Sequence, residues 1–591
     1  MNATLQERIA EAHRSVIAGL RAERVPAGHW VGELSSSALS TATAILALAT
    51  VDRVTHAREI RGGLNWLAQH VNADGGWGDT VRSRSNLSTT ALVWAAFGAA
   101  HADDAFPGII TNTLAYIARV AGSRERLVPA IEAIYGQDRT FSVPITMTLA
   151  LSGRLGPDGW RRVRPLPFEL AALPRGVFGA LRLPVVSYAL PALIAIGQVI
   201  QHHAPRWNPL RRLTRRRTLE VLSTLQPANG GFLEATPLTS FVTMSLAGMG
   251  RSDHLVARRG VEFLRNSVRS DGSWPIDTNL ATWVTTLAIK ALRHSPQSWT
   301  PTERTGLRTW LLGQQYRTEH PYTGAAPGGW AWTDLPGGVP DADDTAGALL
   351  ALDALKESGA PPDLETLRAV NAGVEWLLNL QNGDGGMPTF CRGWGTLPFD
   401  RSTPELTAHA LRAWSVWFPH LSPRQQSRVH QAARRALASL ARMQAPEGTW
   451  NPLWFGNEAA PGQMNPVYGT SQVLVALSDI RATGWSLAPE REETARRWLL
   501  HVQHPDGGWG GAGELPPTLE ETALALSALA GWPPAEAAVH RGADWLVRQV
   551  PAHGNISAAP IGLYFAQLWY FERLYPWVFA AEALGRLNSR K

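Results

Sequence analysis

Cysteine, lysine and long apolar runs are scarce in this chain of 591 residues. Its one cysteine, Cys391, excludes a disulfide framework and is typical of a reducing compartment. The only lysines are Lys290, Lys356 and Lys591, so the net charge of +6 comes almost entirely from arginine, with one dense cluster at 211–217. That cluster fits either a solvated surface or a contact with anionic lipid. No nucleic-acid-binding motif accompanies it, so we expect no nucleic-acid partner.

Membrane spans and metal-binding acidic runs are also missing from the sequence. No stretch of about 18–20 uninterrupted apolar residues exists, so we expect no simple helix to cross a membrane. Residues 1–30 carry charges throughout and no apolar core segment, so we expect no secretory signal. No Asp-Asp-x-x-Asp run occurs, which gives no support to ionisation of a diphosphate by bound magnesium. We expect neither a metal nor a cofactor.

Tryptophan, by contrast, is abundant, with 25 residues, and many of them fall in a repeated turn. The turn joins a glutamine to a glycine-rich segment and an aromatic residue, as in Gln69…Gly76-Trp77 and Gln503…Gly508-Trp509. Related turns occur at 226–232, 271–274, 328–330, 381–387 and 444–450. From Phe232 onward they lie about 40–65 residues apart, each between two helical patterns.

Repeats of one helix pair at this spacing predict an all-α protein of stacked or closed helical arrays. We expect the turn's glutamine to bond the free N–H groups of the next helix, and its tryptophan to pack over that helix end. The helices after the turns begin with polar residues and continue in small ones, which suits an inner ring. The prediction is two α/α barrels, each a double ring of helices, because the chain is too long for one ordinary core.

Three carboxylates in four residues open an apolar helix within Pro340–Ala346. Like charges at this spacing push at least one carboxyl toward its protonated form, which a general acid needs. The alternative is an acidic cluster at a helix start, where aspartate is favoured. One aspartate would satisfy that role, so three indicate chemistry.

The Asp-x-Asp-Asp-Thr-Ala motif at 341–346, the repeated turns and Gly328-Gly329-Trp330-Ala331-Trp332 resemble the squalene–hopene cyclase family of class II terpene cyclases. The resemblance extends essentially from end to end. It implies that Asp343 protonates a terminal alkene and that Asp341 and Asp344 hold its geometry. An isolated alkene is a very weak base, so the donor must be neutral and desolvated.

A second segment, Pro404–His409, resembles the family segment whose histidine hydrogen-bonds the acid. A protonated His409 would strengthen the acid and stabilise the carboxylate left behind. Glu405, one turn earlier, is expected to hold the imidazole. Tyr468 matches a family tyrosine near the histidine and is expected to help return the proton to Asp343. A purely structural role is the alternative for His409.

Aromatic side chains are the other requirement, because tryptophan and tyrosine faces stabilise a carbocation without trapping it. The resemblance implies substrate-binding roles for Trp332, Trp283, Trp454, Phe390 and Tyr564. Core packing is the alternative for each. Two departures from the family, Met387 in place of a tryptophan and Gly179–Leu181 where an aromatic residue is usual, indicate a changed cavity lining.

The same resemblance implies the domain organisation. The acid-bearing barrel is predicted to comprise residues 1–30 and 262–591, with a second barrel, 31–261, inserted between them. The apolar segment 166–200 is interrupted by prolines, so we expect it to lie in one membrane leaflet rather than to span it. A buried inter-domain segment is the alternative. The predicted location is peripheral, at the cytoplasmic side of a membrane.

Together these features predict a class II polyene cyclase that converts squalene or a related triterpene to a polycyclic, hopene-like product. The alternatives are the same chemistry on a prenyl diphosphate or prenylated arene, and a non-catalytic helical scaffold that binds lipid or protein. A zinc-dependent protein prenyltransferase β-subunit would need a zinc set for which Cys391 has no matching context. The oligomeric state stays open, a homodimer included.

Overall fold

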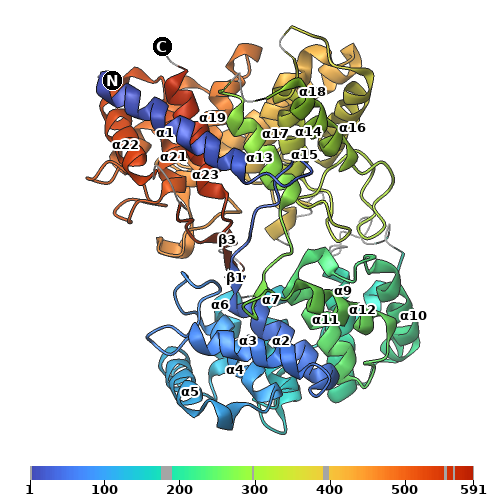
Figure 1. The fold of residues 1–591 in the computed structure, drawn as a ribbon. Helices are drawn as coiled ribbons and strands as arrows, with labels where there is room; N and C mark the ends of the chain where they lie inside the picture. The colour runs from blue at the N-terminus through green and yellow to red at the C-terminus, as the bar shows by residue number, and fades with distance from the viewer. Residues whose placement is uncertain are drawn as a thin grey trace.

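The computed structural model describes residues 3–136, 138–174, 177, 189–295, 299–357, 359–390, 398–550, 556–563, 566 and 568–589. The chain forms two helical lobes joined at a narrow junction (Figure 1). We call the lobe that contains both termini the large barrel and the other lobe the small barrel. Two of the predictions, Tyr564 and Cys391, fall outside the described residues.

The large barrel is a closed double ring. Its inner helices are α13 (Ala281–Leu292), α15 (Ala342–Ala354), α17 (Pro404–Trp417), α19 (Pro466–Asp479), α21 (Leu519–Leu529) and α23 (Tyr575–Asn588). Each packs against the next, and α23 packs against α13, which closes the ring. The outer helices are α1 (Ala3–Ala22), α14 (Pro301–Gly313), α16 (Leu364–Leu380), α18 (Pro423–Met443), α20 (Pro489–His501) and α22 (Glu536–Gln549).

The small barrel repeats this plan. Its inner helices are α2 (Ala38–Asp52), α4 (Leu87–Ala99), α7 (Arg139–Leu151), α9 (Leu190–His203) and α11 (Thr236–Gly248), and α11 packs back against α2. The outer helices are α3 (Ala57–Gln69), α5 (Pro107–Ala121), α6 (Leu127–Tyr135), α10 (Pro209–Leu225) and α12 (Leu255–Ser267). The predicted all-α fold of two α/α barrels is confirmed.

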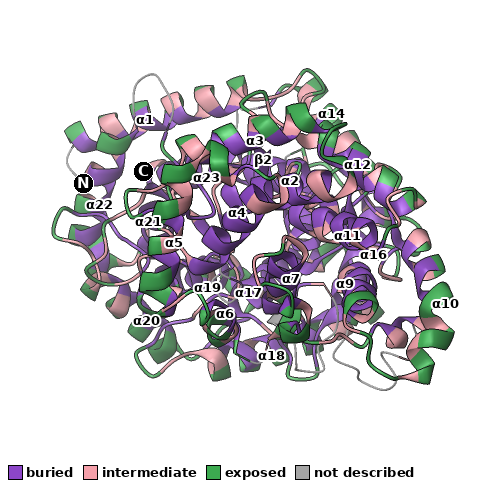
Figure 2. Ribbon diagram, turned by 90° about the horizontal axis from the view of Figure 1, so that it is seen from below, coloured by how far each residue is buried: buried purple, intermediate pink, exposed green. Residues whose placement is uncertain are grey.

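Burial explains why the two kinds of helix differ in sequence. Every residue of α13 is buried, and a helix that is apolar all round has to lie inside the protein. The outer helix α18 instead buries Val429, Ala432, Ala433 and Ala436, the spacing of a single apolar face. Figure 2 shows the same contrast, with buried residues along α2 and α11 and exposed ones along α10.

The repeated turns are held by bonds to the preceding and following helices. The indole Nε1–H of Trp509 donates to the Leu499 carbonyl at 2.8 Å, and its backbone N–H donates to Thr522 Oγ1 at 2.9 Å. The Gln503 side chain donates from Nε2 to two carbonyl oxygens, those of Gly507 at 2.7 Å and Ala538 at 2.9 Å. The predicted bond from glutamine to free N–H groups is therefore wrong. The amide nitrogen has two donors, and it uses one to close the turn at Gly507 and the other to tie the turn to Ala538 on the next outer helix, α22.

Two tryptophans, Trp30 and the turn residue Trp274, show how the chain passes between the barrels. The N–H of Trp30 donates to Thr285 on α13 of the large barrel, and the N–H of Trp274 donates to Thr41 on α2 of the small barrel. Each tryptophan thus meets an inner helix from a distant part of the sequence. Between them, β1 (Ser36–Ser37) pairs antiparallel with β2 (Trp274–Pro275).

The two hydrophobic cores follow the same division. One contains residues between Leu5 and Trp30 and between Trp283 and Leu587, and the other contains residues between Ala38 and Trp274 together with Tyr322 and Val339. Residues 262–274, which the sequence assigned to the large barrel, pack in the small-barrel core because α12 continues to Ser267. A second short hairpin, β3 (Ile561–Leu563) with β4 (Leu568–Tyr570), lies at the junction.

The segment 166–200 is only partly described. Leu190–Ile200 lies in the inner helix α9 and is buried there, so the prediction that this stretch lies in a membrane leaflet is wrong for α9. Its apolar character serves the small-barrel core. Residues 175, 176 and 178–188 are outside the described part. No helix in the described ranges is both long enough and apolar enough to cross a membrane.

Candidate active site

The acidic motif opens inner helix α15 at the end of the large barrel that faces the small barrel. Asp341 is the N-cap residue, and its carboxylate accepts from the Asp344 N–H at 2.8 Å. The Asp341 N–H in turn donates to the Trp330 carbonyl at 3.0 Å. Asp341 thus performs the capping role, and Asp343 is placed in the first turn with its side chain 21% exposed.

The predicted contact between the acid and the histidine is present. His409, on the neighbouring inner helix α17, lies with Nδ1 at 2.5 Å from Asp343 Oδ1. Burial, followed by the charge of Lys290, lowers the pKa of His409 to about 4. The imidazole is therefore uncharged at neutral pH, whereas the sequence analysis predicted a protonated His409.

The cation beside this ring is a lysine that the sequence analysis missed. Lys290 on α13 lies with Nζ at 3.3 Å from His409 Nε2 and is 7% exposed. Burial, with the nearby Arg412 guanidinium, lowers the pKa of Lys290 to about 7. Its signal in the sequence was its rarity, because it is the one charged residue of an otherwise uncharged inner helix, in a chain that uses arginine almost everywhere.

The two flanking carboxyls form a buried pair. Burial raises the pKa of both Asp341 and Asp344, and the negative charge of Asp341 raises that of Asp344 further. Asp344 Oδ1 is buried without a hydrogen-bond partner. The pair therefore favours a protonated form, which keeps negative charge from accumulating beside Asp343.

Glu405 does not hold the imidazole as predicted. Its Oε1 accepts from the backbone N–H groups of Leu453 at 2.8 Å and Trp454 at 3.2 Å. Both ring nitrogens of His409 have other partners, Asp343 and Lys290. Glu405 instead fixes the segment that carries Trp454, one of the predicted substrate-binding residues.

Glu405→Gln is expected to make stability less sensitive to pH. Burial raises the pKa of Glu405 to about 7, so the folded protein holds this proton where the unfolded chain has released it. The contribution favours folding at low pH and is lost as pH rises through about 7. The variant should lose less thermal stability than the wild type between about pH 5 and 8. Exposed Glu365 provides the control, and parallel curves for wild type and Glu405→Gln would contradict the prediction.

The predicted aromatic residues fall into two groups. Trp332 and Trp454 both contact Phe390, with ring centroids 6.0 Å and 6.3 Å away. Phe399, which the sequence analysis missed, joins them at 5.6 Å from both Phe390 and Trp454. Trp332 packs against both hydrophobic cores, so this cluster lies where the two barrels meet.

Trp283 and Tyr468 belong to the other group. Trp283 Nε1 donates to the Tyr575 hydroxyl at 2.7 Å, and its ring stacks 6.4 Å from Phe455. Tyr468 lies 4.7 Å from the same Phe455, and its hydroxyl accepts from Gln472 at 3.3 Å rather than bonding Asp343. Burial raises the pKa of Tyr468, and the charge of Asp343 adds to this, which places the two side chains near one another. The sequence analysis assigned no role to Phe455 or Tyr575.

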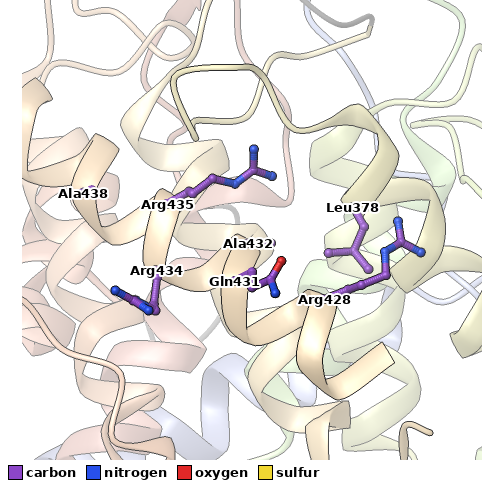
Figure 3. A pocket seen from close by; sticks show the side chains of 7 residues that line it. All are labelled: Leu378, Arg428, Gln431, Ala432, Arg434, Arg435 and Ala438. Atoms are coloured by element: carbon purple, nitrogen blue, oxygen red, sulfur yellow. The ribbon is translucent and has the colours of Figure 1, made fainter. Parts of the chain in front are cut away.

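Metal-binding groups and a surface pocket are the remaining candidates for a functional site. Within the described ranges, no group of three or more His, Cys, Asp or Glu side chains is arranged to hold a metal ion. A surface pocket of about 620 Å³ lies on outer helix α18 beside α16 (Figure 3). Its Arg428 pairs with Glu375 and its Arg435 bonds Gln381, so both guanidiniums serve the outer layer.

Comparison with known proteins agrees with this geometry. Residues 279–589 match the model of the squalene-hopene cyclase C-terminal domain, and residues 14–104 match that of the N-terminal domain. The chain belongs to the squalene-hopene cyclase family.

Individual relatives are distant. A terpene cyclase-glycosyl transferase fusion protein from Humicola fuscoatra is 26% identical over 89% of this chain and 45% of its own length. A copalyl diphosphate synthase from Streptomyces cyslabdanicus is 25% identical over 87% of this chain and 84% of its own. The solved structure of ent-copalyl diphosphate synthase from Streptomyces platensis has a TM-score of 0.56 at 20% identity and covers 99% of both chains, which shows the shared fold. The chain spans about half the length of the first curated relatives that it matches.

Proposed function

We propose that this chain is a protonation-initiated, class II terpene cyclase with Asp343 as the general acid. The observation that carries the proposal is the 2.5 Å contact between His409 Nδ1 and Asp343 Oδ1, on a carboxyl that keeps accessible surface. With Oδ1 occupied by the histidine, Oδ2 is left to hold the acidic proton. That proton passes to the terminal alkene carbon, the π pair forms the new C–H bond, and the positive charge remains on the more substituted carbon.

The aromatic groups supply what the cation then needs. Successive alkenes attack the cationic carbon and close rings, so the charge migrates along the substrate. Trp332, Phe390 and Trp454 on one side, and Trp283 and Phe455 on the other, offer faces that stabilise a cation by roughly 0.5–2 kcal/mol per desolvated contact. They also exclude water, which would trap the cation early.

We propose that the substrate is an uncharged polyene such as squalene, cyclised to a polycyclic, hopene-like product. The support is a carboxyl, that of Asp277, which is hydrogen-bonded to the indole of Trp332. Asp277 Oδ2 accepts from Trp332 Nε1 at 3.1 Å, and Glu234 lies near enough for its charge to raise the pKa of Asp277, after burial. A diphosphate brought to this side of the junction would meet these two carboxyls, which offer no positive charge to pair with it.

A prenyl diphosphate is the second candidate substrate, favoured by the copalyl diphosphate synthase that aligns with most of the chain. The same acid would start the reaction, and only the binding of the polar end would differ. A prenylated arene is a further candidate with the same initiating step.

The test incubates detergent-solubilised protein separately with squalene, geranylgeranyl diphosphate and a prenylated arene, followed by extraction and mass spectrometry. A new isomer or hydrate of squalene supports the proposal. Conversion of the diphosphate or the arene alone would overturn the choice of substrate and retain the chemistry. Failure with all three would favour a lipid- or protein-binding scaffold.

We also propose a peripheral location at the cytoplasmic side of a membrane, which would deliver a water-insoluble polyene. The support is an exposed apolar group beside basic residues: Trp207 is 93%, Leu210 60% and Leu213 79% exposed, next to and within the arginine-rich helix α10. Flotation with vesicles that contain anionic lipid tests this. Trp207→Ser with Leu213→Ser should reduce binding, and unchanged flotation would contradict it.

A further inference from the structure

We propose that Lys290 is a positioning residue that fixes the tautomer of His409 and keeps a positive charge beside Nε2 of its ring. This inference rests on the proposed function of Asp343 as an acid and concerns how that acid is prepared. The three side chains are linked by two contacts across three successive inner helices: Lys290 on α13 contacts His409 on α17, and His409 contacts Asp343 on α15, the helix between them in the ring.

The geometry leaves each ring nitrogen with one partner. Nε2 lies 3.3 Å from Lys290 Nζ, and Nδ1 lies 2.5 Å from Asp343 Oδ1. The lysine and the histidine are 7% and 8% exposed. Each contact is therefore well shielded from water, which strengthens it.

The chemistry of the two groups then determines which nitrogen carries hydrogen. An ammonium has three donors and no acceptor, so a protonated Lys290 makes Nε2 accept. A neutral imidazole has one N–H, which must then be on Nδ1 and donate to Asp343 Oδ1. If the proton moves from the lysine to the ring, the amine accepts from Nε2–H and Nδ1 still donates. In both states the acid receives a hydrogen bond on Oδ1.

Without the lysine this constraint disappears. The ring is free to adopt the other neutral tautomer, with hydrogen on Nε2 and a bare Nδ1. A bare Nδ1 would accept the acidic proton of Asp343 on Oδ1, directing it to the imidazole and away from the alkene. Lys290 therefore selects the arrangement that leaves the proton on the oxygen facing the substrate.

Charged groups of both signs surround Lys290. Arg412 on α17 and Arg293 on its own helix repel it, while Asp343 on α15 and Glu582 on α23 attract it. Arg412 and Arg293 also pair with Asp479 on α19, at 2.6 Å and 3.4 Å. Burial and Arg412 together lower the pKa of Lys290 to about 7, which is still above the pKa of about 4 of His409, so below about pH 7 the amine holds the proton and Nε2 accepts.

The experiment measures the tautomer directly, without substrate. Protein labelled with ¹⁵N-histidine is studied by NMR in the wild type, Lys290→Met, Lys290→Arg and the control Lys356→Met, with His409→Asn to assign the signals. Lys356 is a suitable control because it lies in the same barrel and pairs with Asp353 at 2.6 Å, away from the histidine. We expect Nδ1 of His409 to carry hydrogen in the wild type, Lys290→Arg and Lys356→Met, and the tautomers to mix or switch in Lys290→Met.

Activity provides the second measurement. Lys290→Met should lower kcat by about 10- to 100-fold with little change in KM, as for loss of a charge-assisted hydrogen bond, and Lys290→Arg should restore most of it. An unchanged tautomer in Lys290→Met would overturn the inference. If that variant does not fold, the wild-type spectrum decides: Nε2 should respond as pH passes through about 7, and no response would be the overturning result. Because the NMR measurement needs no turnover, failure of the proposed function remains distinguishable.

Discussion

Replacing Asp343 with asparagine is expected to reduce the rate of polyene cyclisation by at least about 10⁴-fold. An amide has nearly the shape of the carboxyl and can still accept from His409 Nδ1, but it has no acidic proton to give to an alkene. The protonation of a very weak base is the step that cannot be bypassed. Substrate consumption and product, measured by mass spectrometry after extraction, report the effect.

The matched control for this variant lies on the same helix. Asp353, also on α15, pairs with Lys356 at the surface, and its side chain is 28% exposed. Asp353→Asn should leave the rate unchanged, and both variants should unfold at nearly the wild-type temperature. A rate for Asp343→Asn within about tenfold of wild type would show that another group supplies the proton.

The fold could be predicted because its determinants are local and repeated. A turn such as Gln503…Trp509 uses residues close in sequence, with the indole bonding a carbonyl ten residues earlier. The inner helices were recognisable from small residues and polar first turns. The direction of the glutamine bonds was not predictable, because an amide donates and accepts equally well and only the position of the next outer helix decides.

The contact between Asp343 and His409 was predictable, because two motifs that resemble the family imply it. Contacts that depend on tertiary packing were not. Glu405 was assigned by helical spacing to the imidazole, but its carboxylate reaches the backbone at Leu453 and Trp454, which the fold brings from the next repeat. Lys290 meets His409 across 119 positions of sequence, and no local pattern connects them.

The same limit applies to the aromatic groups. The sequence analysis named Trp332 and Phe390 but missed Phe399. Several residues separate Phe399 from Phe390, and the sequence alone does not show that the two rings meet. Tyr575 closes the other group because α23 completes the inner ring beside α13, and ring closure is visible only in three dimensions. The aromatic residues of both groups come from several different segments of the chain, so which of them meet depends on how the barrel closes.

Asp479→Asn is expected to lower the free energy of unfolding by roughly 3–5 kcal/mol, because it leaves the buried guanidinium of Arg412 without the carboxylate that it pairs with. The carboxylate of Asp479 lies 2.6 Å from Arg412, 3.0 Å from Arg586 and 3.4 Å from Arg293. Burial acts against its charge, but these arginines hold the pKa of Asp479 well below its usual range. A lowered pKa favours folding above about pH 4, and this contribution is lost as pH falls further.

Calorimetry of both proteins at neutral pH measures this loss, with the transition of the large barrel as the one that should move. Glu493→Gln breaks an exposed pair with Arg497, whose side chains are 50% and 72% exposed, and should cost no more than about 1 kcal/mol. Equal shifts for the two variants would contradict the prediction. The difference in expected cost follows from exposure to solvent: water can replace the lost partner of Arg497, whereas Arg412 is only 7% exposed and is shielded from water.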